Sequence, residues 1–370
     1  MLSIPIITLI LIINQSFSID SPTINLNKKY NVQLSNPEEG KFLGPLQLFD
    51  IYNDFVQVYN KEKTNEKFGN FQNNFYKIIT HNSDKTKTWK MGLNQYSDMS
   101  DKEFFEHYKL MAPQACSAMN EKDNLLAKLF ADFEDRPSHV DWREEGKVSP
   151  VKNQGHCGSC WTFSTTGALE AHYRIYKNSE PIFSEQQLVD CAGDFENHGC
   201  HGGLPSHAFE YIKYTSNGLE SEKDYPYEGK DGVCRYDSSK GLGHIPKGSY
   251  NITALDEDEL HNCLAHAGPV SVGFQVIDDF RHYSHGVYSS DTCKNGAMDV
   301  NHAVLAVGYG VCGKCKKPYY IVKNSWGTEW GDEGYFKIEA GVNMCGIAQC
   351  NSFPNMGQFV DEETLSSLLE

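Results

Sequence analysis

Basic residues are scarce in this chain relative to acidic ones. Its 370 residues include 33 lysines and arginines against 49 aspartates and glutamates, for a formal net charge of −16. Nucleic acids and anionic membrane surfaces attract cationic proteins, so this balance argues against either as a partner.

Long apolar runs are also missing. Residues 1–13 are almost wholly apolar, but a membrane-spanning helix needs roughly 18 or more such residues. Small residues follow in the positions that a signal-peptide cleavage site requires. We therefore expect a secretory signal over residues 1–18, removed near Ser18, and no membrane span.

Cysteine is absent from the first part of the chain. The first is Cys116, and eleven of the twelve lie from Cys157 onward, so the chain changes character between residues 110 and 140. We expect the chain to follow the secretory route, to the lysosome or out of the cell. On this route most cysteines form disulfides, and one could remain as a reactive thiol, although the count alone does not tell which cysteines pair. Asn251 begins Asn-Ile-Thr, a glycosylation acceptor of the kind such a route would use.

Apolar periodicity separates a helical half from a strand-rich half. Between residues 46 and 82 apolar side chains recur at helical spacing in two runs split by the polar stretch 61–67, which predicts two amphipathic helices. Further helices are predicted at 158–176, where a loop leads into the helix, and at 184–191, where Ser184 is the expected N-cap. Short β-branched or aromatic runs follow at 269–276, 302–308 and 319–323. This order predicts an α+β fold with a cleft between the halves.

A thiol at the start of a predicted helix is a candidate nucleophile. A helix N-terminus and a nearby imidazolium can lower the pKa of a thiol such as Cys160 from about 8.5 to roughly 3.5–7.5. If the two strands flanking Gly313 form an antiparallel hairpin centred on it, Asn324 lies opposite His302, with Cβ atoms about 4.5–5.5 Å apart. The amide oxygen of Asn324 then accepts from one imidazole nitrogen and leaves the other facing the thiol. A lone histidine or asparagine here is usually structural, but their joint placement predicts a Cys, His, Asn relay.

Three separated blocks of sequence resemble those of a known family. The run 154–161, Gln-Gly-His-Cys-Gly-Ser-Cys-Trp, resembles the active-site signature of the papain family of cysteine proteases. Asn-His-Ala at 301–303 and Asn-Ser-Trp-Gly at 324–327 resemble its other two blocks. The cysteine and glycine landmarks of the family are matched by Cys191 and by residues 199–203.

The resemblance covers about residues 138–354 and implies a papain-like two-lobed fold, with a helical left lobe and a β-barrel-like right lobe. The protease domain would span residues 136–356, with a tail at 357–370. The chain would hydrolyse peptide bonds of peptides and proteins through an acyl-enzyme, without cofactor or metal: Cys160 attacks the carbonyl, His302 carries the proton and Asn324 orients the imidazole. The other implied site residues are the oxyanion-hole donor Gln154 and the substrate-binding residues Gly202, Gly203, Leu204, Ala303 and Trp326, of which the tryptophan also shields the His–Asn pair from water.

The segment before the body resembles the inhibitory propeptide of the same family. Residues 92–98, Gly-Leu-Asn-Gln-Tyr-Ser-Asp, are similar to its second motif. Its helix spacing is kept by Phe71, Asn74, Ile78 and Asn82. This implies a helical propeptide over residues 19–135 that fills the cleft as an inhibitor until acid pH and cleavage near Asp135 or Arg136 release it. We expect the enzyme to be a monomer.

Residues 112–119, Ala-Pro-Gln-Ala-Cys-Ser-Ala-Met, are similar to the mini-chain of an aminopeptidase branch of the family, a propeptide fragment retained through a disulfide. The resemblance pairs Cys116 with Cys350. A tethered fragment that ends near Met119 in a carboxylate would block long substrates and attract a free α-ammonium. The alternative is an endopeptidase that discards this fragment.

The resemblance also implies the remaining disulfides and leaves Cys160 free. The implied pairs are Cys157–Cys200, Cys191–Cys234 and Cys293–Cys345. Cys263 lies in a predicted helical run and is expected to be a buried small hydrophobe. For Cys312 and Cys315, at the predicted hairpin tip, a local disulfide is favoured over a metal because no second ligand pair is found.

Two other function classes fit less well. A thiol redox protein would explain the C-x-x-C pair of Cys157 and Cys160, but such motifs lie in a βαβ setting that is not predicted here. A non-catalytic binding homologue would be expected to lose Cys160, His302 or Gln154, and all three are present.

Overall fold

The computed structural model describes residues 22–30, 34, 43–110 and 136–357. The predicted signal segment, the mini-chain with Cys116 and Met119, and the tail beyond residue 357 lie outside the described residues. Within those ranges no helix has both the length and the apolar character to cross a membrane.

The described helices fall into two groups, one before and one after residue 136. The first group consists of α1 (Pro22–Lys29), α4 (Pro45–Tyr59), α5 (Asn65–Ser83) and α6 (Asp101–Tyr108). The second group consists of α8 (Cys160–Tyr176), α9 (Glu185–Cys191), α10 (Pro205–Tyr214) and α11 (Glu257–His266). The 3-10 turns are η2 (Gly193–Phe195), η3 (Ser238–Lys240), η4 (Phe280–His282), η5 (Ala297–Asp299) and η6 (Met344–Gly346).

The two amphipathic helices predicted between residues 46 and 82 are confirmed as α4 and α5. Asn60 ends α4 in the left-handed conformation, and the Thr64 side chain caps α5 by accepting from the Lys67 N–H at 3.1 Å. The apolar faces meet through aromatic rings, with Phe55 and Phe71 at a centroid distance of 5.0 Å.

One sheet holds the strands of the body together with a strand from the preceding segment. The strands are β1 (Trp89–Met91), β2 (Val140–Asp141), β3 (Ser249–Asn251), β4 (Val270–Phe274), β5 (Tyr283–Tyr288), β6 (His302–Val311), β7 (Pro318–Lys323), β8 (Tyr335–Glu339) and β9 (Ser352–Pro354). Their order is β1-β5-β8-β7-β6-β4-β9-β3, with β2 on β6. The antiparallel pairing of β1 with β5 extends the sheet of the body by one strand of the leading segment.

The register of the β6–β7 hairpin differs from the predicted one. Leu305 pairs with Lys323, and a bulge between Ala306 and Gly308 then shifts the pairing by one residue toward the tip. The hairpin therefore does not centre on Gly313, and the prediction that Asn324 lies directly opposite His302 is wrong. His302 pairs with Phe274 of β4.

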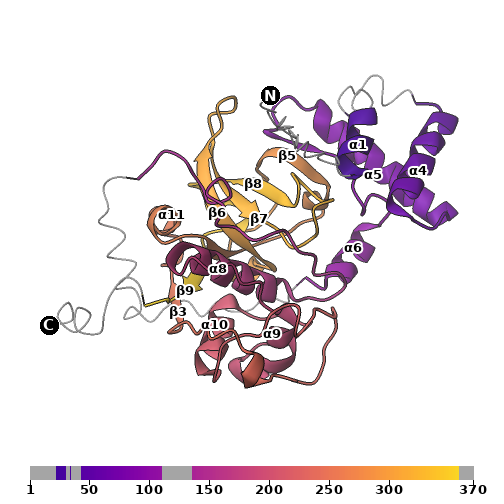
Figure 1. Cartoon of the computed structure of the whole chain (residues 1–370). Helices are drawn as coiled ribbons and strands as arrows, with labels where there is room; N and C mark the ends of the chain where they lie inside the picture. The colour runs from indigo at the N-terminus through magenta and orange to yellow at the C-terminus, as the bar shows by residue number, and fades with distance from the viewer. Residues whose placement is uncertain (1–21, 31–33, 35–42, 111–135, 358–370) are drawn as a thin grey trace, which may run out of the picture.

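Two apolar cores lie on opposite faces of the β6–β7 hairpin. One joins α8, α9 and α10 to a face of β6 and β7 through residues such as Leu169, Phe209 and Leu305. The other lies within the sheet and continues into α4 and α5. Figure 1 shows α8–α10 on one side of the molecule, the sheet on the other, and α6 leading from the first helices to the body. The predicted two-lobed α+β fold is thus confirmed.

Candidate active site

Cys160 is the first residue of α8 and is 1% exposed. Its Sγ accepts a hydrogen bond from the backbone N–H of Ala303 at 3.5 Å, so the strand that carries His302 crosses the helix start. Burial raises the pKa of this thiol to about 11, while the N–H groups of Ala303 and Trp161 act in the opposite direction. In this covered state the thiol is protonated at neutral pH.

A hydrogen bond of 2.8 Å joins His302 Nε2 to Asn324 Oδ1. The two residues are diagonal rather than direct neighbours across the hairpin, which remains within reach of long side chains. The backbone N–H of Ser325 also donates to Asn324 Oδ1, at 2.8 Å, and this holds the amide in place.

The amide oxygen of Asn324 decides the tautomer of His302. An amide oxygen can only accept, so Nε2 of His302 carries the proton and Nδ1 is the basic nitrogen. Nδ1 is buried and has no hydrogen-bond partner among the described residues. Burial lowers the pKa of His302 to about 4, against the opposing effect of the Asn324 hydrogen bond.

Trp326 covers the pair from one side. Its ring stacks on His302 at a centroid distance of 5.0 Å and an angle of 29°, and the residue is fully buried. On the opposite face of the Trp326 ring, the ring of Tyr108 of α6 stacks at a centroid distance of 4.6 Å. Water therefore has no direct path to the His302–Asn324 hydrogen bond from this side.

Two hydrogen bonds hold the side chain of Gln154 in place. Its Nε2 donates to the carbonyl of Cys157 at 3.0 Å, and its Oε1 accepts from the Ser325 hydroxyl at 2.6 Å. A side-chain amide has two N–H donors, so one of those on Gln154 remains for a ligand.

A small apolar pocket lies beside β6, the strand that carries His302. Leu204 and Ala303 line it together with Val272, Val300 and Cys350. The neighbouring glycines are required by close packing. A Cβ on Gly203 would lie 2.4 Å from Asn197 Oδ1, and Gly202 has φ of +111°.

The segment before the body packs against this site. Phe104 and Tyr108 pack their rings on Trp326, and the side chain of Gln95 donates to the Trp326 carbonyl at 3.2 Å. The Lys109 carbonyl then lies so close to Gly158 that a Cβ there would come within 2.7 Å of its oxygen. No side chain but hydrogen fits at this point, two residues before the thiol.

Sequence reasoning missed two contacts that hold this segment in place. The buried Arg281 donates to Asn74 Oδ1 and pairs with Asp101, each at 2.7 Å. The rings of His107 and His156 lie with centroids 3.8 Å apart. Burial, and then repulsion from His156, lowers the pKa of His107 to about 4. His156 and Asn74 stood within recognised motifs, but nothing in the local sequence pointed to His107 or Arg281 as their partners.

Disulfides join segments of the body, some near the site and one at the distant tip of the β6–β7 hairpin. The structure forms Cys157–Cys200, Cys191–Cys234 and Cys293–Cys345, and also joins Cys312 to Cys315. Cys160 and Cys263 are the free thiols of the described residues, both buried. Cys350 is disulfide-bonded as well. Asn251, the predicted glycan acceptor, ends β3 and is partly exposed.

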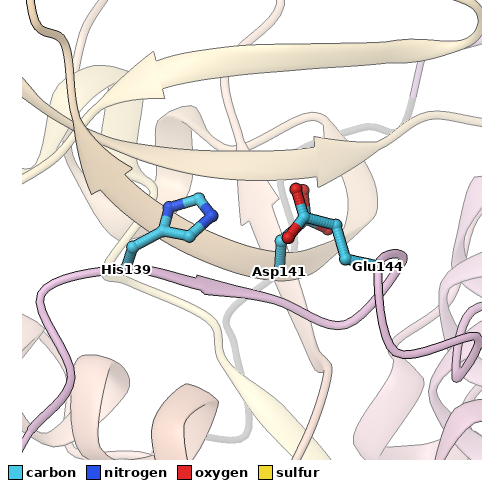
Figure 2. Close-up of side chains that lie close together, drawn as sticks. All are labelled: His139, Asp141 and Glu144. Carbon is cyan, nitrogen blue, oxygen red and sulfur yellow. The ribbon is translucent and has the colours of Figure 1, made fainter.

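One group of side chains in the described ranges has the arrangement of metal ligands. His139, Asp141 and Glu144 place one ligand atom each within 4.8 Å of the others (Figure 2). The guanidinium of Arg143 already binds both carboxylate oxygens of Asp141, at 2.9 and 2.6 Å. This cation neutralises the carboxylate that a metal would need, so we assign no metal to the group.

Comparison with known proteins agrees with this geometry. The chain matches "Papain family cysteine protease" over residues 136–355 and "Cathepsin propeptide inhibitor domain (I29)" over residues 52–104. It is 51% identical to a "Thiol protease aleurain-like" of Arabidopsis thaliana, over 82% of this chain and 83% of that protein. It is 50% identical to the "Pro-cathepsin H" of Bos taurus, over 80% and 85% of the respective chains.

Solved structures show the same architecture with a leading segment in place. The proform of the ragweed pollen allergen Amb a 11, a cysteine protease, matches with a TM-score of 0.78 at 34% identity, over 86% of this chain and 88% of that one. Procathepsin L 3 from the larval midgut of Tenebrio molitor matches with a TM-score of 0.74 at 34% identity, over 83% and 99%. This chain belongs to the papain family of cysteine proteases and is made as a zymogen with a cathepsin-type inhibitory propeptide.

Proposed function

We propose that the mature enzyme cleaves peptide bonds through a thiolate on Cys160. His302 takes the thiol proton on Nδ1, Cys160 Sγ attacks the carbonyl carbon, and the imidazolium returns the proton to the leaving amine. Water then hydrolyses the thioester with His302 as the base. The observation that carries this proposal is the Asn324 hydrogen bond, which leaves Nδ1 of His302 as the basic nitrogen.

The negative oxygen of each tetrahedral intermediate needs donors. The free N–H of Gln154 and the backbone N–H of Cys160 at the start of α8 are the two candidates, because the first N–H groups of a helix have no intrahelical acceptor. A donor of this kind lowers the barrier by about 2.7–4 kcal/mol in comparable sites.

The mature enzyme in this proposal is an aminopeptidase with a retained mini-chain. The names of the similar aleurain-like and pro-cathepsin H proteins favour this branch of the family. The described cysteines other than Cys350 comprise four mutual bridges and two free thiols. Since Cys350 is itself disulfide-bonded and the sequence has twelve cysteines, Cys116 is the remaining candidate for its partner.

The position of Cys350 gives the mini-chain its effect. Cys350 lies in the wall of the apolar pocket beside Ala303 and Leu204, so a fragment bonded to it would enter the non-primed side of the cleft. Its terminal carboxylate, near Met119, would attract the α-ammonium of a substrate and leave no space for further residues. Gly202 and Gly203 would hold the substrate backbone.

Mass spectrometry of the mature enzyme tests this assignment. We expect a fragment containing Cys116 that is released only by reductant. Cys116→Ser should raise the cleavage of amino-blocked substrates relative to free-amine ones by at least tenfold. An unchanged ratio would favour the alternative, an endopeptidase without a retained mini-chain.

The proposal also includes processing and location. A signal peptide at 1–18 would direct the chain to the lysosome or out of the cell, with glycosylation at Asn251. The propeptide would span 19–135, the monomeric protease domain 136–356 and a tail 357–370. Support comes from the propeptide match, which ends at residue 104, and the protease match, which begins at residue 136.

A further inference from the structure

The tip of the β6–β7 hairpin carries a pair of cysteines that the protease mechanism does not use. Cys312 and Cys315 form a disulfide within the sequence Cys-Gly-Lys-Cys, and both are partly exposed. The flanking Val311 is 60% exposed. We propose that Cys312–Cys315 is a thiol–disulfide exchange site that small anionic monothiols of the glutathione class open.

The hydrogen bonds at the tip distinguish the two sulfur atoms. The backbone N–H of Cys315 donates to Cys312 Sγ, with a donor–acceptor distance of 2.9 Å. A thiolate on Cys312 would keep this donor, and a hydrogen bond to a charged acceptor is stronger than one to a neutral acceptor. Cys312 is therefore the better leaving group, and an attacking thiolate reacts at Cys315.

The charge at the tip favours both the attacking and the leaving thiolate. Lys314 and Lys316 are exposed beside the bridge, in a chain whose net charge is −16. Lys90 of the propeptide lies near Lys314. Burial lowers the pKa of Lys90, and repulsion from Lys314 lowers it further. Lys317 is paired with Glu339 at 2.6 Å and contributes less. Nearby lysines lower thiol pKa values and attract anionic ligands.

The turn does not depend on the bridge. Cys312 N–H donates to the Lys317 carbonyl at 2.9 Å, and Lys316 N–H donates to the Cys312 carbonyl at 2.8 Å. The bridge closes a sequence separation of 3, whereas Cys157–Cys200 closes one of 43. Opening the shorter loop releases less chain entropy, and the two thiols stay close enough to reoxidise within the molecule.

The exchange proceeds in two displacements. A thiolate RS⁻ attacks Cys315 Sγ, so that an R–S–S–Cys315 bond forms, the Cys312–Cys315 bond breaks and its electron pair leaves on Cys312. A second RS⁻ attacks the sulfur of the bound R group, which releases RSSR and a thiolate on Cys315. The two protons of the monothiols pass to the two cysteines, so the bridge is reduced by two electrons and the monothiols are oxidised.

The site can be observed separately from Cys160. It lies at the opposite end of β6 from His302, and a ten-residue strand is about 30 Å long. The experiment uses the full zymogen with Cys160→Ala, which can neither process itself nor react at that position. The protein is equilibrated with graded glutathione and glutathione disulfide, and free thiols are alkylated and located by peptide mass spectrometry.

We expect Cys312–Cys315 to be half-reduced at a glutathione concentration at least tenfold below that needed for the other described bridges. With limiting glutathione the mixed disulfide should form on Cys315 rather than on Cys312. Reduction of this bridge together with Cys157–Cys200, Cys191–Cys234 and Cys293–Cys345, or after them, would overturn the proposal.

Charge variants test the mechanism without removing the bridge. Lys314→Gln combined with Lys316→Gln should slow opening by glutathione at least threefold, and opening by the neutral 2-mercaptoethanol to a smaller extent. Lys223→Gln, at an exposed lysine on the other lobe, should leave both rates unchanged. Equal rates for the double variant and the parent with both thiols would contradict the role assigned to the tip lysines.

Discussion

At the scale of single residues, the amide of Asn324 determines what His302 can do. Its oxygen accepts from Nε2 of His302 and from the backbone of Ser325, so rotation of the amide would lose two hydrogen bonds. The basic nitrogen is thereby held in one orientation. This is a positioning effect, and it acts through the imidazole.

Asn324→Ala should lower kcat/KM by about 5- to 150-fold, which corresponds to the roughly 1–3 kcal/mol lost when a buried donor has no acceptor. KM should change little. Asn324→Asp keeps an acceptor and raises the pKa of His302, so it should retain more activity and shift the acid limb of the pH–rate profile upward. Equal losses in both variants, with an unchanged profile, would argue against positioning.

Lys152 has a structural role close to the site. Its ammonium lies 2.8 Å from Glu170 and 2.5 Å from Glu185, and both carboxylates are buried. Burial disfavours the charge on Lys152, but the two carboxylates outweigh this effect and raise its pKa. The carbonyl of the same lysine accepts from the Gly327 N–H, next to Trp326.

Lys152→Met should destabilise the Cys160→Ala zymogen by about 3–5 kcal/mol, because it leaves two buried carboxylates without their shared cation. The midpoint of thermal unfolding should fall by roughly 10 °C, at about 2–4 °C per kcal/mol. Calorimetry measures the unfolding midpoint, and Lys223→Met, a change at an exposed lysine, serves as the control. A shift below 2 °C would show that the cluster contributes little.

At the scale of elements, α6 couples the propeptide to pH. His107 lies near the end of this helix and contacts His156 of the protease domain, with Tyr96, Tyr108 and Lys61 nearby. The docked state binds a proton on His107 only near pH 4, whereas the released state binds it near the ordinary value of about 6.5. The docked state therefore loses stability as pH falls from about 6.5 to about 4, by at most about 1.4 kcal/mol per unit.

His107→Phe should slow acid processing of the zymogen by at least tenfold at pH 4.5, and should change it little at pH 7, because the phenyl ring keeps the packing without a proton site. Gel analysis of the conversion rate across this pH range gives the profile. His81 provides the comparison, since burial also lowers its pKa to about 4 but its ring packs on Trp89 of the propeptide itself. If the pH profiles of the His107 and His81 variants both superimpose on that of the unmodified zymogen, neither histidine controls release.

At the scale of the whole molecule, the propeptide sets the protonation state of the Cys160 thiol. With α6 on Trp326 and the Lys109 carbonyl against Gly158, Cys160 is 1% exposed and burial raises the pKa of its thiol to about 11. Removal of the propeptide admits water to the cleft, and the ionised thiol then gains solvation.

Alkylation of Cys160 by iodoacetamide at pH 7 should therefore be at least 100-fold faster in the mature enzyme than in the zymogen. The midpoint of the pH dependence of this rate should also be lower in the mature form. Cys263, which is buried in α11 in the protease domain, should stay unreactive in both forms. Comparable rates at Cys160 before and after processing would show that the propeptide does not cover the thiol in solution.

Local sequence was sufficient to predict the features that depend on neighbouring residues. The spacing of aromatic residues predicted α4 and α5, and Cys160 was expected at the start of a helix, where α8 begins. Ser184 was expected to cap the helix that became α9. Each of these features is decided within about two helical turns of chain, so short-range spacing carries the information.

Tertiary structure decided the contacts between distant segments. The bulge between Ala306 and Gly308 moved the hairpin register, and the wrong register prediction came from assuming a symmetric tip centred on Gly313. The contact of His107 with His156 and that of Arg281 with Asn74 join residues with no shared local pattern. Such contacts depend on how bulges, loops and packed faces bring separate segments together, and a one-residue change in pairing alters every later contact along a strand.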